Sequence, residues 1–172
     1  VDTETNSLDP HQADLVGVSL CSKIGKACYI PIGHKSSKCI DKNIVIKKLK
    51  PLLEDPSVKK IGQNIKFDFI VLYKHGITIS SMEDTMLMSY VLDAGKNRHN
   101  MDTLSEIHLG HKTISFKEIV GTGKKEINFS DVEIDKAKDY AAEDADITFR
   151  LYKKFIKNLK LEKMVNIYEI FE

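Results

Sequence analysis

The pattern of apolar and polar positions predicts an α/β chain that begins with strands and ends with helices. The second and third strands flank the polar turn Lys23-Ile24-Gly25-Lys26, and together with the first they are typical of an antiparallel meander. Apolar residues then recur at helical spacing, interrupted by two further short strands. The expected strands are residues 1–5, 15–21, 27–32, 58–62 and 77–79. The expected helices are residues 42–53, 67–75, 84–93, 101–109, a short one within 113–128, 130–159 with a break near Asp144, and 162–171.

This order of elements predicts one α/β domain over residues 1–172, with a mixed central sheet flanked by helices. The sheet should combine the antiparallel meander with the two further strands. The chain opens at Val1, inside an expected strand and without an initiating methionine. We therefore expect a domain excised from a longer protein.

Composition narrows the class of protein. No apolar run approaches the ~20 residues of a transmembrane helix, so no membrane partner is expected. The chain has 3 cysteines without a CxxC pair, which argues against a disulfide framework or a zinc ribbon and favours the reducing cytoplasm. The net charge of +1 neither indicates nor excludes nucleic-acid binding.

Four carboxylates lie in three short segments of the sequence, each of which carries a pair of polar residues. Asp2 and Glu4 are two residues apart, so a strand would point both to one side. In each of the other two segments the polar residues are four positions apart, so a helix would place both on one face. These pairs are Asn64 with Asp68 and Tyr140 with Asp144. Like charges gathered in this way need multivalent cations among them, so the pattern predicts a two-metal phosphodiester hydrolase.

Single acids also have simpler interpretations. The acidic pair near the N-terminus could lie in a solvated turn, and Asp68 could be an acid favoured by the dipole in the first turn of a helix. Glu143 and Asp146 fit a solvated acidic face, because Asp146 lies about 200° of helical rotation from Asp144. We therefore expect Asp144, and not Asp146, in the site. Asp84 is expected to cap the helix that follows it.

Three segments resemble the exonuclease motifs of bacterial DNA polymerase I, in order and across essentially the whole chain. They are Val1-Asp2-Thr3-Glu4-Thr5, Ile61-Gly62-Gln63-Asn64-Ile65-Lys66-Phe67-Asp68 and Tyr140-Ala141-Ala142-Glu143-Asp144-Ala145-Asp146. The resemblance implies a ribonuclease-H-like fold and the proofreading 3′→5′ exonuclease activity of the DEDD superfamily. Tyr140 in the third motif implies its DEDDy branch. Further implications are a single-stranded or frayed DNA 3′ end as substrate, release of nucleoside monophosphates, and a covalently linked polymerase domain.

The same resemblance implies that the four carboxylates hold two divalent ions, Mg²⁺ or Mn²⁺. Two hard cations ~4 Å apart can activate water and neutralise the transition state, and oxygen ligands select these metals. Asp2, Glu4 and Asp144 are assigned to the tighter metal. Asp2 would also bridge to the second metal, whose other contact is Asp68. Tyr140 is expected to orient the attacking water.

Contacts with the DNA strand are implied for five residues. Leu8 would wedge between the terminal bases, and Phe116 would pack on the terminal nucleotide. Gln63, Asn64 and Arg98 would contact the single strand. From the residues alone, Leu8 and Phe116 could instead be core, and Asn64 could be a helix cap.

Two other functions stay open at this point. A ribonuclease-D-like 3′→5′ exonuclease would share the metal chemistry but act on RNA. A catalytically silent module would bind single strands without hydrolysing them.

Overall fold

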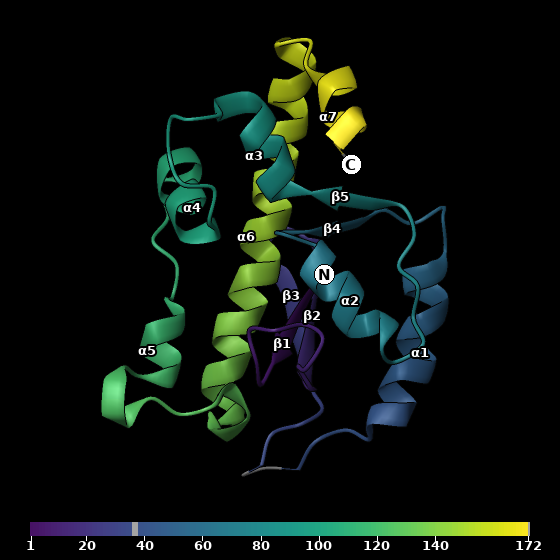
Figure 1. Cartoon of the computed structure of the whole chain (residues 1–172), viewed down its shortest axis with the longest axis vertical. Helices are drawn as coiled ribbons and strands as arrows, with labels where there is room; N and C mark the ends of the chain where they lie inside the picture. The colour runs from purple at the N-terminus through teal and green to yellow at the C-terminus, as the bar shows by residue number, and fades with distance from the viewer. Residues whose placement is uncertain (36–37, 172) are drawn as a thin grey trace.

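The computed structural model describes residues 1–35 and 38–171 as two small groups of strands surrounded by helices (Figure 1). The strands are β1 (Asp2–Thr5), β2 (Leu15–Lys23), β3 (Lys26–Pro31), β4 (Lys60–Gly62) and β5 (Met82–Asp84). The helices are α1 (Lys42–Glu54), α2 (Lys66–Tyr73), α3 (Thr85–Asp93), α4 (Met101–Leu109), α5 (Phe116–Val120), α6 (Ile134–Leu161) and α7 (Val165–Phe171). Two 3₁₀ turns are η1 (Gly123–Lys125) and η2 (Phe129–Asp131).

The first three strands form the expected antiparallel meander in the order β1-β2-β3. Asp2 pairs with Ser19 and Glu4 pairs with Gly17. Opposed residues of an antiparallel pair point to the same face, so the two acids stand above small residues of the neighbouring strand. A Cβ at Gly17 would lie 2.1 Å from the Tyr29 hydroxyl, so only glycine leaves room for this ring. Tyr29 pairs with Ser19, the partner of Asp2, so its ring lies on the same face of the sheet as the two acids.

The two further strands, β4 and β5, pair in parallel in a sheet of their own, and the mixed α/β fold class is confirmed. The amino group of Val1 donates to the carbonyl of Ile61 at 2.7 Å, which places β1 beside β4. One strand prediction was wrong, because β5 is Met82–Asp84 and residues 77–79 belong to no strand. Ile77 and Ile79 are 0% and 3% exposed. Their apolar side chains alternate with polar ones because the segment is extended and buries one side in the protein core. That segment bonds to the ends of α2 and α1 instead of to a strand.

Helix α6 runs unbroken through the middle of the molecule, so the break predicted near Asp144 was wrong (Figure 1). Its interior has neither proline nor glycine, the residues that most often kink a helix. Ala137, Ala141 and Ala145 are almost fully buried, and these small side chains let α6 pack closely on β2 and β3. Tyr140 and Asp144, near the predicted break, instead line a cavity.

Helix α2 begins at Lys66, so the predicted stacking of Asn64 and Asp68 on one helix face was wrong. Asn64 has φ 60°, a left-handed conformation outside the helix. Nor is Asn64 the N-cap, since that position is Ile65 and has no side-chain capping bond. The backbone N–H groups of Asn64 and Ile65 both donate to Asp84, at 2.9 and 3.1 Å. Asp84 also accepts from Met86 N–H and caps α3, as predicted.

Three apolar clusters hold these elements together. The first joins β2 to α1 and α2, the second joins α3, α4, α6 and α7, and the third joins Val16 to α5, η2 and α6. Within the described residues, no helix is both long and apolar enough to span a lipid bilayer.

Candidate active site

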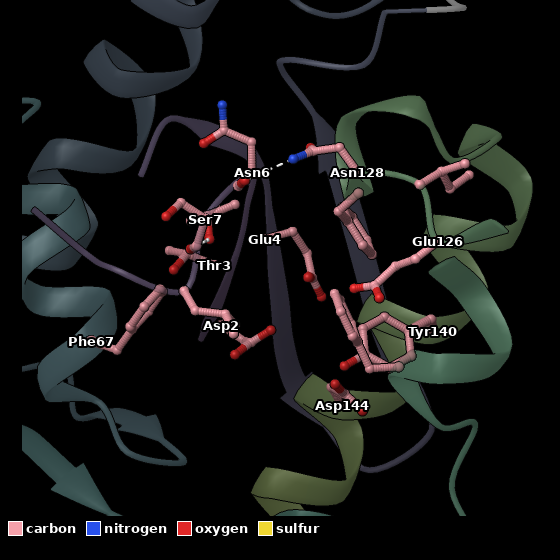
Figure 2. Close-up of a pocket in the computed structure, with 15 residues that line it drawn as sticks. Asp2, Thr3, Glu4, Asn6, Ser7, Phe67, Glu126, Asn128, Tyr140 and Asp144 are labelled. Atoms are coloured by element: carbon pink, nitrogen blue, oxygen red, sulfur yellow. Dashed lines mark hydrogen bonds between the residues drawn. The ribbon is translucent and has the colours of Figure 1, made fainter. Parts of the chain in front are cut away.

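Three carboxylates converge where β1 meets the middle of α6 (Figure 2). Asp2 and Glu4 come from alternate positions of β1, which point to one face of a strand. Asp144 reaches them from α6, far away in the sequence. One oxygen of each side chain lies within 4.8 Å of an oxygen of the others. The structure thus brings together three of the four predicted carboxylates.

The three acids line a cavity of ≈ 870 Å³. Its walls come from β1 and the loop after it, from Phe67 at the start of α2, and from the segment between α5 and α6. Asn128 joins two of these walls, because its side-chain amide donates to the carbonyl of Asn6 at 2.7 Å. The acids therefore lie in a depression bordered by apolar and polar side chains.

Asp68 is held just behind this group by Thr3. The amide and hydroxyl of Thr3 donate to Asp68 Oδ1 at 2.8 and 2.6 Å, and Asp68 is only 2% exposed. Thr3 lies between Asp2 and Glu4 on β1, so its side chain points to the opposite face of the strand. Asp68 is not among the three acids whose oxygens converge, although the charge of Asp2 acts on its pKa.

Crowding and loss of water make these acids hard to ionise together. Burial, followed by the charge of Asp144, raises the pKa of Asp2 to about 7. Burial and the charge of Asp2 raise the pKa of Asp68 to about 8, and burial raises the pKa of Asp144 to about 8. The pKa of Glu4 is raised well above its ordinary value by burial and by Asp2. A bound cation would oppose all four shifts.

The site fits a divalent metal ion by its donor set. All of its donors are carboxylate oxygens, the ligands that Mg²⁺ and Mn²⁺ prefer. Among the described residues, Glu4 Oε1 is buried without a hydrogen-bond partner. A buried polar atom of this kind costs free energy unless something else satisfies it. Asp2, Glu4 and Asp144 are the residues that could hold the ion.

Tyr140 lies one helical turn before Asp144 on the same face of α6, as its spacing predicted (Figure 2). Burial, together with the charges of Asp144 and Glu4, raises the pKa of its phenol above the ordinary value, so the hydroxyl stays protonated. The ring is 6.0 Å from Phe129 and 6.1 Å from Phe116 between centroids. A neutral hydroxyl is thereby fixed at the edge of the carboxylate group.

The predicted DNA contacts separate into two groups. Leu8 and Phe116 line the cavity and are 89% and 41% exposed, so neither is core. Gln63, Asn64 and Arg98 are absent from the described lining. The side chain of Gln63 bonds instead to the Thr85 hydroxyl at 2.5 Å and to the carbonyl of residue 99 at 2.8 Å.

Sequence reasoning missed Thr3, Asn128 and Phe129. Thr3 carried a usable signal, since a residue between two inward-facing acids must face the element behind the strand. Asn128 and Phe129 carried none, because their distance from β1 along the chain hides their place in the cavity wall. Phe129 stacks on Phe116, with 6.1 Å between centroids and 8° between planes.

The antiparallel and parallel strands, the long helix beside them and the converging carboxylates are typical of nucleases with a ribonuclease-H-like fold. The family described as 3′-5′ exonuclease matches residues 1–160. This chain belongs to that family, the 3′→5′ exonuclease domain of the DNA polymerase I group, which confirms the resemblance seen in its motifs.

Relatives of known type include DNA polymerase I of Rhizobium leguminosarum, 43% identical over 99% of this chain and 19% of the polymerase. DNA polymerase I of Pseudomonas aeruginosa is 45% identical over 92% of this chain and 18% of the polymerase. The chain thus spans less than a fifth of these relatives. Among solved structures, Brucella melitensis NrnC has a TM-score of 0.75 and 24% identity, covering 98% of this chain and 76% of NrnC. That likeness supports the fold.

Proposed function

We propose that this chain removes nucleotides one at a time from the 3′ end of single-stranded or frayed DNA, using two divalent ions, Mg²⁺ or Mn²⁺. The observation that carries this proposal is the group of Asp2, Glu4 and Asp144 at the cavity, with Glu4 Oε1 lacking a protein partner among described residues. Bound cations would activate water, neutralise charge on the phosphate and stabilise the leaving oxygen. Family membership supports the reaction type.

In the proposed reaction, the oxygen of a water molecule attacks the terminal phosphorus and the bond from phosphorus to the 3′ oxygen breaks. The shortened strand keeps a 3′-hydroxyl after taking up a proton, and a nucleoside 5′-monophosphate leaves. Tyr140, protonated near neutral pH, holds the water by a hydrogen bond and does not remove its proton. Thr3 holds Asp68 in place behind the acids of β1 through two hydrogen bonds.

Leu8 and Phe116 are proposed to hold the 3′-terminal nucleotide, since both line the cavity with exposed apolar surface. Stacking on such side chains is tolerant of base identity, as removal of any mispaired terminus requires. Gln63, Asn64 and Arg98 remain weaker candidates for contacts with the strand. A covalently linked polymerase domain is proposed as the partner, because the relatives that match are whole polymerases.

A ribonuclease-D-like 3′→5′ exonuclease that acts on RNA is the second candidate. It would share the metal chemistry, and NrnC, which shares the fold, has one structure described as bound to pGG. A silent single-strand-binding module is the third candidate. It would need no ion at the carboxylates.

One assay separates the three candidates. The chain is incubated with a 5′-labelled DNA oligomer or its RNA counterpart, with Mg²⁺, Mn²⁺ or EDTA, and products are read by length. We expect a ladder shortening from the 3′ end, faster on DNA and absent in EDTA or with Asp144→Ala. Faster shortening of RNA would favour the second candidate. Binding without shortening under any metal would favour the third.

A further inference from the structure

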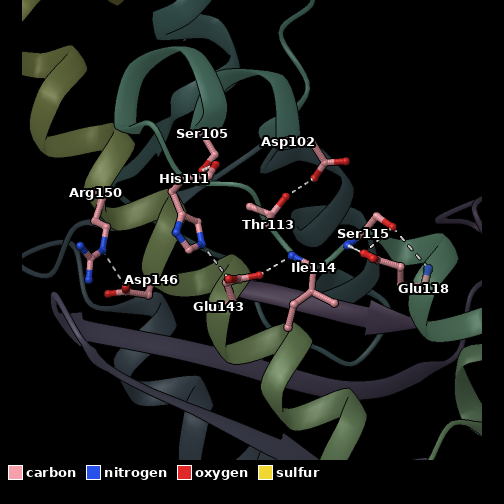
Figure 3. Close-up of polar contacts among 10 residues, drawn as sticks. All are labelled: Asp102, Ser105, His111, Thr113, Ile114, Ser115, Glu118, Glu143, Asp146 and Arg150. Atoms are coloured by element: carbon pink, nitrogen blue, oxygen red, sulfur yellow. Dashed lines mark hydrogen bonds and ion pairs between the residues drawn. The ribbon is translucent and has the colours of Figure 1, made fainter.

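We infer that Glu143 is a positioning residue that fixes Phe116 at the mouth of the cavity, an inference that rests on the proposed function. Glu143 precedes Asp144 on α6 but does not line the cavity among its described residues. Its carboxylate instead accepts from the N–H of Ile114 at 2.6 Å and from His111 Nε2 at 2.8 Å (Figure 3). The acid beside a candidate metal ligand is thus bound to the segment between α4 and α5.

That segment leads directly into the residue proposed to hold the terminal nucleotide. Ile114 is followed by Ser115, the N-cap of α5, whose capping box with Glu118 starts the helix. Phe116 is the first residue of that helix and lines the cavity. Two peptide units therefore separate the N–H held by Glu143 from the Phe116 backbone.

Helix α5 is held near its N-terminal end by two bonds, that of Glu143 to Ile114 and that of the Thr113 hydroxyl to Asp102 at 2.7 Å. It is 5 residues long, and Val120 at its far end is its only buried residue. Val120 packs in the cluster with Val16 and Phe129. The helix is thus anchored by apolar contact at its C-terminal end and by the bonds to Glu143 and Asp102 just before its N-terminal end. A short helix anchored at both ends keeps Phe116 stacked on Phe129, with 8° between the ring planes.

Asp146 provides a matched control on the same helix. Its carboxylate likewise accepts from a backbone N–H, that of Gly25 at 2.7 Å, and from a side chain, that of Arg150 at 2.7 Å, with the Cys21 thiol a further donor at 3.6 Å. The bond to Gly25 holds the β2–β3 turn and the bond to Arg150 stays within α6, so neither reaches the segment before Phe116. A general weakening of α6 would appear in variants of both acids, whereas loss of the α5 anchor would appear only in variants of Glu143.

The test compares Glu143→Ala, Glu143→Gln, Asp146→Ala and Phe116→Ala in the whole chain. We expect Glu143→Ala to raise KM for single-stranded DNA about 5- to 20-fold while kcat changes less than about 2-fold, because a binding contact is lost and the metal ligands remain. Glu143→Gln keeps an acceptor for Ile114 and should stay close to wild type. Asp146→Ala should keep the wild-type KM. If Glu143 acts through Phe116, the double variant should be no worse than Phe116→Ala alone.

Two measurements do not depend on turnover. Amide exchange of Ile114 should be at least about 10-fold faster in Glu143→Ala, since its N–H loses its partner. In EDTA, a 2-aminopurine at the 3′ end of a DNA oligomer should be less quenched by Glu143→Ala than by wild type. If the wild-type chain had no exonuclease activity, the proposed function would be wrong. The amide exchange and the 2-aminopurine quenching would still show whether Glu143 positions Phe116.

A wild-type KM in folded Glu143→Ala, an equal KM rise in Asp146→Ala, or an additive double variant would overturn the inference. If Glu143→Ala does not fold, Ile114→Pro removes the same N–H without altering α6. The KM rise is then expected in Ile114→Pro, and a wild-type KM there would equally overturn it.

Discussion

Thr3 holds Asp68 with two hydrogen bonds to the same oxygen, from its amide at 2.8 Å and from its hydroxyl at 2.6 Å. The strand that presents Asp2 and Glu4 on one face thus restrains a further acid on the other. Because Thr3 lies between Asp2 and Glu4 on β1 and bonds to Asp68 on α2, movement of β1 would move all three acids together. The proposed site therefore depends on a residue that binds no metal.

Replacing Thr3 tests this link. A hydrogen bond to a carboxylate contributes about 1.5–3 kcal/mol, so Thr3→Val, which keeps the amide but loses the hydroxyl, should lower kcat about 10-fold or more. Thr3→Ser keeps the donor and is the matched control. Steady-state kinetics on a single-stranded oligomer provide the measurement. Equal rates for the two variants would show that the hydroxyl does not matter to Asp68.

Asp144 and Asp146 should respond very differently to removal. Asp144→Ala takes away an oxygen ligand and should lower kcat more than about 10³-fold, while metal-free binding of single strands persists. Asp146→Ala should leave turnover nearly unchanged, because Asp146 bonds to Gly25 and Arg150 and not to the cavity. Turnover rates and a binding titration in EDTA measure both effects. A large loss of turnover in Asp146→Ala would mean that the wrong face of α6 has been assigned.

Tyr140→Phe isolates one hydroxyl. The ring should keep its packing against Phe116 and Phe129, so only the hydrogen bond at the carboxylates is lost. We expect kcat to fall about 10- to 100-fold at unchanged metal dependence. The protonated state of the phenol also predicts that the pH profile of the variant keeps its wild-type shape. An unchanged rate would remove Tyr140 from the mechanism.

The metal-free protein should lose stability as pH rises. Asp2 has its pKa raised from 3.8 to about 7, and Asp68 and Asp144 from 3.8 to about 8. Between about pH 4 and pH 8 the folded state therefore binds more protons than the unfolded state, so the free energy of unfolding falls through this window. In EDTA we expect Tm at pH 8 to lie about 5 °C or more below Tm at pH 5.

Mg²⁺ or Mn²⁺ should reverse that loss, because a cation replaces the protons that the acids would otherwise hold. The rise of Tm on adding metal should be larger at pH 8 than at pH 5. Asp144→Ala should show a smaller rise at both values. A metal effect independent of pH would argue against binding at these carboxylates.

Leu8 offers a test of substrate binding that leaves the fold intact. It is 89% exposed, so Leu8→Ala should leave Tm unchanged. If Leu8 separates the terminal bases, the variant should degrade frayed duplex ends about 3- to 10-fold more slowly, since roughly one stacking contact is lost. Comparison of single-stranded and frayed-end substrates measures this effect. If Leu8→Ala and wild type degraded both substrates at equal rates, Leu8 would not contact the DNA strand.

Much of the fold was predictable because its signals are local. The antiparallel meander followed from apolar runs around a turn containing Gly25, which has φ 75°. The predictions of a strand at residues 77–79 and of a break in α6 were wrong because buried or cavity-lining residues gave the same sequence pattern as those features. Ile77 and Ile79 alternate like a strand because both are buried in an extended segment, and Asp144 looked like a helix break because its polar face meets a cavity.

The sequence by itself determined which polar side chains share one face of an element, because residue type and spacing fix which oxygens lie on one side of a strand or one turn of a helix. That was enough to pair Asp2 with Glu4 and Tyr140 with Asp144. Only the tertiary structure decided how those pairs meet, since the distance between β1 and α6 depends on packing between segments far apart in the chain. The tertiary structure also showed that Asp68 bonds to Thr3 and that Glu143 bonds to the segment before Phe116. Hydrogen bonds between different elements produce no periodic pattern in the sequence, so they could not be predicted from it.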